Sequence, residues 1–206
     1  MQKKQEKITV KPKLKLFINA KFIKSASKKD EFIVDELPQI AIVGRSNVGK
    51  SSLINLLTNN SKMAKTSSTP GRTRLVNYFN INNKFYLVDL PGYGYHKASK
   101  SIANAWDAVM NDYFVDNQKL KLVFVLLDSR IMPTDLDKQM LDYLATNEIS
   151  AVIIMTKTDK ISRSDLFLNM NKISKEIRFN KDLILATSAL KKQGVERIEE
   201  LLIDYL

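Results

Sequence analysis

The chain has 206 residues, of which 44% are apolar and 27% are charged, and this composition excludes a disordered or low-complexity protein. Cysteine is absent and there is a single histidine, which excludes disulfides, zinc–thiolate sites and multi-histidine metal sites. The formal net charge of +11 points to a polyanionic partner such as nucleic acid. Because the sequence shows neither the ~20 apolar residues of a membrane helix nor a secretory signal, we expect a cytoplasmic protein without membrane contact.

The positive charge is concentrated in two segments. Residues 1–30 contain ten lysines and two acidic residues, residues 62–100 contain seven basic residues and one acidic residue, and the rest of the chain is slightly acidic. We expect residues 1–20 to form a partly flexible basic extension, with an edge strand around residues 14–18. This extension is either a solvated tail or a nucleic-acid contact. Residues 21–206 are expected to form one domain.

From residue 38 onward, apolar runs alternate with helical stretches, a pattern typical of an α/β sheet with helices on both faces. The apolar runs predict strands at 39–43, 74–81, 85–88, 122–127, 151–155 and 183–186. Helices are predicted at 50–58, 98–114, 134–146, 163–179 and 194–205. Asn82 and Asn83 separate two of the strands and predict a hairpin turn.

The first predicted strand is followed by GRSNVGKS at residues 44–51, which fits the pattern G-x-x-x-x-G-K-[ST] at the start of a helix. Glycines in such a loop let N–H groups turn toward phosphate oxygens, while Lys50 reaches the β and γ phosphates and Ser51 offers a hydroxyl to Mg²⁺. The loop predicts nucleotide binding by Gly44, Arg45, Ser46, Asn47, Val48, Gly49, Lys50, Ser51 and Ser52.

A second motif, Asp89-Leu90-Pro91-Gly92, ends the strand at 85–88. Alone it is an ordinary turn, but at this distance after a phosphate loop its carboxylate can hold a magnesium-bound water. The Gly92 N–H can meet a γ-phosphate. We therefore expect Asp89, with Ser51, on the metal side of a nucleotide site.

Two further motifs distinguish GTP from ATP. Thr156-Lys157-Thr158-Asp159 follows the strand at 151–155, and a carboxylate such as Asp159 accepts two hydrogen bonds from guanine but is repelled by adenine. The Lys157 stem can lie across the base. Thr187-Ser188-Ala189 follows the last predicted strand, where a small-residue turn can donate an N–H to the guanine carbonyl. Together these motifs favour GTP, although an ATPase or a kinase remains an alternative.

In this combination and order the motifs resemble those of the EngB (YihA/YsxC) family of bacterial ribosome-assembly GTPases, over about residues 20–206. The resemblance also rests on residues 69–73, TPGRT, and on Thr156, which replaces the commoner Asn. It implies a P-loop NTPase fold of the Ras-like kind, a three-layer α/β/α sandwich whose mostly parallel sheet has one antiparallel strand. It further implies Mg²⁺-dependent GTP hydrolysis to GDP, association with the large ribosomal subunit or its precursor, and a role in cell division or septation. We expect a monomer.

The resemblance implies that Thr73 is the switch threonine, which completes the Mg²⁺ shell with Ser51 when GTP is bound. From the residues alone, Thr66 and Thr69 are alternative candidates. The rest of the nucleotide-contacting switch would be Gly71, Arg72, Arg74 and Leu75.

Tyr93 stands where Ras-like enzymes carry a water-positioning Gln, so we expect slow intrinsic GTP hydrolysis that a bound ion or a partner must accelerate. Asn47 either holds a K⁺ ion near the phosphates or only stabilises the loop. Tyr93 and Tyr95, with Lys97 and Lys100, are candidates for stacking on RNA, and His96 is expected to be a solvated loop residue. Besides a GTPase switch, an RNA-binding assembly module with GTP as a structural ligand remains an alternative.

Overall fold

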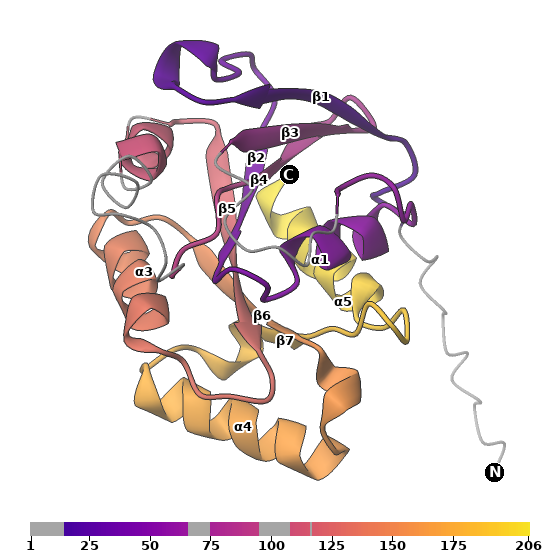
Figure 1. The fold of residues 1–206 in the computed structure, drawn as a ribbon, viewed down its shortest axis with the longest axis vertical. Helices are drawn as coiled ribbons and strands as arrows, with labels where there is room; N and C mark the ends of the chain where they lie inside the picture. The colour runs from indigo at the N-terminus through magenta and orange to yellow at the C-terminus, as the bar shows by residue number, and fades with distance from the viewer. Residues whose placement is uncertain (1–14, 66–74, 95–107, 116) are drawn as a thin grey trace, which may run out of the picture.

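The computed structural model describes residues 15–65, 75–94, 108–115 and 117–206. These residues contain one seven-stranded sheet with helices on both of its faces (Figure 1). The strand order is β1-β3-β4-β2-β5-β6-β7. Strand β3 pairs antiparallel with β1 and β4, and the pairings from β4 to β7 are all parallel. The strands are β1 (Ala20–Ala26), β2 (Gln39–Gly44), β3 (Val76–Ile81), β4 (Phe85–Asp89), β5 (Leu120–Asp128), β6 (Ala151–Thr156) and β7 (Ile184–Ala186).

Helices cover both faces of the sheet, because the buried strands alternate apolar side chains between two cores. The helices are α1 (Lys50–Leu57), α3 (Asp135–Thr146), α4 (Arg163–Glu176) and α5 (Val195–Leu202), and residues 108–114 are also helical. In β2, Ile40 and Ile42 pack with α1 and α5, whereas Ala41 and Val43 pack with α3, α4 and residues 110–114. The predicted three-layer α/β/α sandwich with one antiparallel strand is confirmed.

The edge strand predicted at 14–18 is wrong. The edge strand is β1, which begins at Ala20. Phe17 is instead buried, with its ring centroid 5.8 Å from that of Phe85, and the N–H of Leu16 donates to Glu199 Oε1 at 2.7 Å. This segment is therefore held by the buried Phe17 ring and by the hydrogen bond from Leu16 N–H to Glu199, and not by backbone pairing with a neighbouring strand.

Most other predicted elements are found with shifted ends. Strand β5 is longer than the apolar run at 122–127 on both sides, and α4 and α5 end before the predicted residues 179 and 205. The hairpin at Asn82 and Asn83 is confirmed, with φ of 55° and 56° at these residues. The predicted helix at 98–114 is described only from residue 108. Among the residues described, no helix is long and apolar enough to cross a membrane.

Candidate functional site

The four sequence motifs meet at one edge of the sheet. Strands β2, β4, β6 and β7 are parallel, and each is followed at its carboxyl end by one motif. In open α/β sheets ligands bind at this edge. The topology therefore brings together residues that are more than 140 positions apart in the sequence.

The loop at residues 44–51 wraps from β2 into α1, and its two glycines are required by geometry. Gly49 has a φ of 119°, in the left-handed region that favours glycine. A Cβ on Gly44 would lie 2.8 Å from Val48 Cγ1. Helix α1 begins at Lys50, so the last two residues of the loop lie in its first turn, and its first N–H groups and positive dipole end face the same site as the lysine.

Asp89 and Gly92 lie against this loop. Burial raises the pKa of the Asp89 carboxyl, and the nearby Lys50 ammonium opposes that rise. Among the described residues, Asp89 Oδ1 is buried without a hydrogen-bond partner. A Cβ on Gly92 would lie 3.0 Å from Lys50 Nζ, so the backbone at Gly92 closely approaches the lysine.

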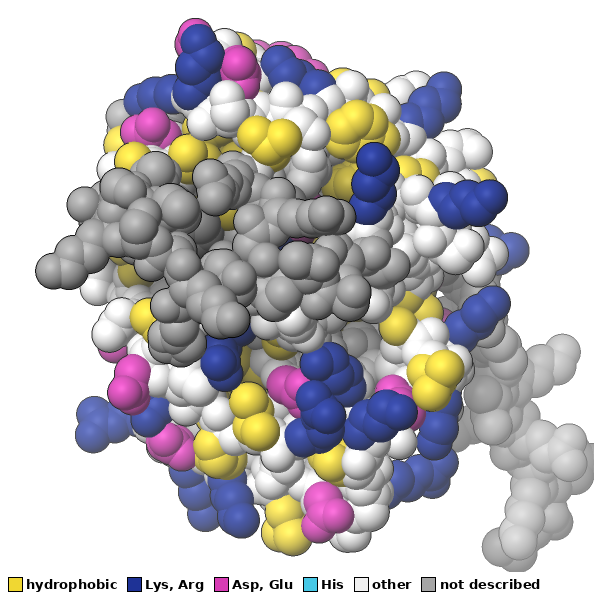
Figure 2. Space-filling view, in the orientation of Figure 1, with side chains coloured by type: hydrophobic (Ala, Val, Ile, Leu, Met, Phe, Trp, Pro, Cys, Tyr) yellow, Lys and Arg dark blue, Asp and Glu magenta, His cyan; other side chains and the backbone are white. Residues whose placement is uncertain are grey.

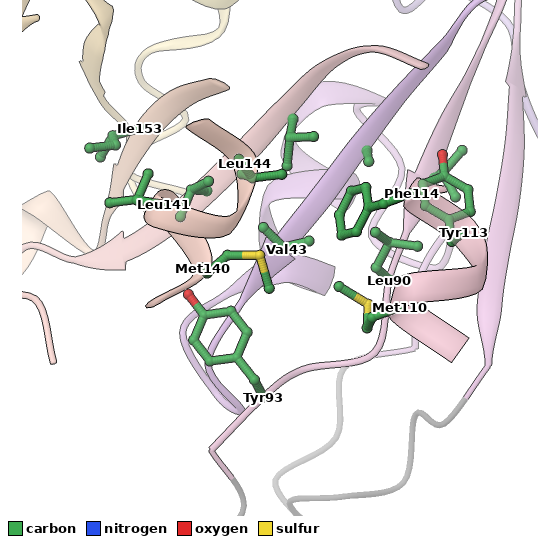
Figure 3. Packing of buried hydrophobic residues seen from close by; sticks show 14 of the residues in the cluster. Val43, Leu90, Tyr93, Met110, Tyr113, Phe114, Met140, Leu141, Leu144 and Ile153 are labelled. Atoms are coloured by element: carbon green, nitrogen blue, oxygen red, sulfur yellow. The ribbon is translucent and has the colours of Figure 1, made fainter. Parts of the chain in front are cut away.

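Tyr93 is joined to the phosphate loop through its backbone and to α3 through its side chain. Its carbonyl accepts from Ser46 N–H at 3.0 Å, and its N–H donates to Gly44 O at 3.2 Å. The side chain is 4% exposed and its hydroxyl donates to Asp137 Oδ1 at 2.8 Å; Figure 3 shows it pointing toward Met140 of α3. The prediction that Tyr93 is an exposed residue for stacking on RNA is therefore wrong, because its ring fills the core.

The other predicted residues around this turn fall outside the described part of the chain. These are Thr66, Thr69, Gly71, Arg72, Thr73, Arg74, Tyr95, His96, Lys97 and Lys100. Of the predicted switch contacts, Leu75 is described: it directly precedes β3 and is 39% exposed.

At the other end of the site, β6 is tied to the phosphate loop by two side chains. The single hydroxyl proton of Thr156 Oγ1 is shared between Val48 O at 2.7 Å and Leu127 O at 3.2 Å. Lys157 Nζ donates to Asn47 O at 2.9 Å. A threonine at position 156 thus links the end of β6 directly to the loop through its hydroxyl.

Asp159 and the turn after β7 line a neighbouring cavity of about 290 Å³. Ser188 Oγ donates to Asp159 Oδ1 at 2.7 Å, and this hydrogen bond holds the pKa of the Asp159 carboxyl below its ordinary value. The N–H groups of Thr187 and Ser188 donate to Met155 O and Gln193 O. Of the three predicted donors in this turn, the Ala189 N–H is the one without a partner among the described residues.

Asp128, the last residue of β5, lies at the site but was not predicted from the sequence. Its carboxylate accepts a hydrogen bond from Lys157 Nζ at 2.9 Å and from Arg130 at 2.7 and 2.8 Å. An acidic residue directly after a buried apolar run is the signal that marks Asp89 after its strand, and the same signal was present at Asp128.

A phosphate loop, an acidic turn beside its lysine and a cavity lined by Lys157 and Asp159 define the class of protein as a P-loop GTPase. The family model described as "50S ribosome-binding GTPase" matches residues 39–157. Among curated proteins, the "Probable GTP-binding protein EngB" of Clostridium kluyveri is 47% identical over 190 residues, covering 90% of this chain and 96% of that protein. The protein of the same name from Mesoplasma florum is 45% identical and covers 93% and 98%.

Among solved structures, the crystal structure of a probable GTP-binding protein engB has a TM-score of 0.68 at 21% identity and covers 81% of this chain and 97% of that one. Era in complex with MgGDPNP and nucleotides of 16S ribosomal RNA has a TM-score of 0.67 at 22% identity, covering 82% and 57%. These two likenesses show the fold, and the sequence relatives show the family. The chain belongs to the EngB family of GTP-binding proteins and is a GTP hydrolase.

Proposed function

We propose that this protein binds GTP with Mg²⁺ and hydrolyses it as a switch in assembly of the large ribosomal subunit, and that normal cell division or septation depends on this role. The observation that carries the proposal is the meeting of the four motifs at one sheet edge, in a chain of the EngB family. The family description refers to the 50S subunit.

In this proposal the guanine base occupies the cavity beside Asp159. The Asp159 carboxylate accepts from the guanine N1–H and exocyclic amine, and the Ala189 N–H donates to the guanine carbonyl. The Lys157 stem lies across the base. The phosphates lie on the loop at 44–51, with Lys50 at the β and γ phosphates and the Gly92 N–H at the γ-phosphate.

The residues present fit a magnesium ion. Asp89 Oδ1 is a buried acceptor without a partner among the described residues, and Ser51 stands in the first turn of α1 beside Lys50. Carboxylate, hydroxyl and phosphate oxygens are the ligands that Mg²⁺ prefers. Ser51 and Asp89 would hold the ion, with Thr73 joining them in the GTP state. Bound Mg²⁺ neutralises charge on the phosphate oxygens.

Hydrolysis is expected to be slow without a further group, because the Tyr93 side chain lies in the core and carries no amide to orient water. Asn47, an exposed loop residue, is the candidate ligand for a K⁺ ion near the phosphates; its side chain has no hydrogen-bond partner among the described residues. Equal turnover in K⁺ and Na⁺ buffers would rule out this role and leave the ribosomal particle as the group that accelerates GTP hydrolysis.

The proposed partner is the large ribosomal subunit or its precursor, contacted by a monomer in the cytoplasm. The net charge of +11 favours ribosomal RNA as the contact. The Lys and Arg side chains of the described residues are spread over the face shown in Figure 2 with acidic side chains among them, so among these residues charge alone does not mark one docking patch.

The test is single-turnover GTP hydrolysis with and without purified large subunits, together with co-sedimentation in the presence of a GTP analogue or GDP. We expect faster hydrolysis with subunits, and salt-sensitive binding that is tighter with the analogue. Hydrolysis unchanged by subunits, with equal binding in both nucleotide states, would favour an assembly module that uses GTP as a structural ligand.

A further inference from the structure

The carboxylate of Asp128 holds two cations at the end of β5. Arg130 donates to it through Nε at 2.8 Å and Nη2 at 2.7 Å, and the Arg130 N–H adds a third bond at 3.1 Å. These bonds fix the orientation of the carboxylate, whose side chain is 10% exposed. Asp128 Oδ2 also accepts from Lys157 Nζ at 2.9 Å.

The position of the Lys157 ammonium rests on two acceptors, Asp128 Oδ2 and Asn47 O, each at 2.9 Å. A cavity of about 200 Å³, lined in part by Asn47, Asp128, Ile131 and Lys157, lies beside it. On the side of this cavity, no closely packed side chain among the described residues holds the Lys157 ammonium in place. Loss of the charged acceptor leaves one neutral carbonyl to hold a flexible side chain.

A second carboxylate, that of Asp159, lies near Lys157. Lys157 and Asp159 both line the cavity of about 290 Å³ that is proposed to take the guanine base. Asp159 Oδ2 already lies 3.7 Å from Lys160 Nζ, and its Oδ1 accepts from Ser188. A released Lys157 ammonium would be attracted to Asp159 and would compete with the guanine N–H groups for its oxygens.

We infer that Asp128 is a positioning residue for guanine recognition, which keeps Lys157 on the phosphate loop and away from Asp159. This inference rests on the proposed roles of Lys157 and Asp159. Asp128, at the end of β5, would then contribute to base selection although it belongs to none of the four motifs.

The test compares affinities for GDP and for inosine diphosphate, which lacks the exocyclic amine, by competition with a fluorescent GDP on the full chain. In Asp128→Ala we expect the preference for GDP to fall about fivefold, the size typical of one partly exposed charge pair. In a Lys157→Ala background, adding Asp128→Ala should leave the preference of that background unchanged, because no ammonium remains to be released. Glu200→Gln, which breaks an exposed ion pair with Arg197, is the control with the same change of charge.

A preference unchanged in Asp128→Ala, or lowered by the same factor when position 157 is already alanine, would overturn the inference. A purely structural role would weaken binding of both nucleotides by one factor and leave their ratio unchanged. Asp128→Glu keeps a charged acceptor and should keep most of the preference. Should Asp128→Ala not fold, Asp128→Ser serves in its place. A different result would contradict the proposed guanine site itself: an Asp159→Asn variant that keeps the preference for GDP over inosine diphosphate.

Discussion

The two ends of the nucleotide site differ in how the side chains of their motif residues are paired. At the guanine end, the side chains of Thr156, Lys157 and Asp159 all make hydrogen bonds within the protein. At the phosphate end, Asp89 Oδ1 and Arg45 Nε are buried without partners among the described residues. An unpaired buried polar group costs folding free energy, whereas a satisfied network rigidifies a site. We infer that the side chains of the guanine end are preorganised and that bound nucleotide and metal would pair the open groups of the phosphate end.

The largest effect is expected at the guanine end, from Asp159→Asn. The amide loses the charge and presents a donor to guanine, so GTP affinity should fall on the order of 10³-fold while xanthosine triphosphate binds better. Competition against a fluorescent GDP measures both. Asp204→Asn, an exposed carboxylate near the C-terminus, should change neither. Retained GTP preference in Asp159→Asn would place base recognition elsewhere.

Asp89→Asn separates function from stability at the phosphate end. Single-turnover hydrolysis should slow roughly 10²-fold, because a group that holds charge near the reacting phosphate is lost. The nucleotide-free protein should gain about 1 kcal/mol in free energy of unfolding, a usual size for functional-site trade-offs.

The stability gain of Asp89→Asn should depend on pH. Burial raises the pKa of Asp89 in the folded state, so its ionisation destabilises the fold as pH rises above the unfolded-state value of about 4. The gain should therefore be present at neutral pH and vanish in acid, as followed by urea unfolding. A loss of stability at neutral pH would show that the Asp89 carboxylate is well satisfied without nucleotide.

A smaller effect is expected from Thr156→Val, which keeps the shape of the side chain and removes its two hydrogen bonds. The carbonyl of Val48 would lose its partner, so the free energy of unfolding should fall by about 1–2 kcal/mol. GDP should dissociate faster in stopped-flow measurements because the phosphate loop is less firmly held. Thr146→Val, at the exposed end of α3, is the matched control, and equal behaviour of the two variants would refute the preorganisation of this end.

The smallest effect on activity is expected from Tyr93→Phe. The substitution removes the hydroxyl that donates to Asp137, so stability should fall by about 1 kcal/mol. Hydrolysis should stay within about twofold, because the ring lies in the core. A tenfold slower hydrolysis would instead give the hydroxyl a part in the reaction.

Much of the fold and site could be predicted because each motif directly follows an apolar run that forms a buried strand. The phosphate loop at 44–51 and Asp89 were found in this way. The burial of Tyr93 was not, since its partner Asp137 is 44 residues away and the local sequence resembles an exposed loop. The position of Asp128 after an apolar run carried a local signal, but its contact with Lys157 after the neighbouring strand β6 depends on strand order, which no local pattern contains.

Amide hydrogen exchange of the protein with and without GDP and Mg²⁺ tests the contrast between the two ends most directly. The account predicts that residues 44–51 and 89–94 gain strong protection on binding, whereas 151–159 and 184–189 exchange slowly in both states. Fast exchange at 151–159 and 184–189 without nucleotide, with strong protection there only after binding, would contradict a preorganised guanine end.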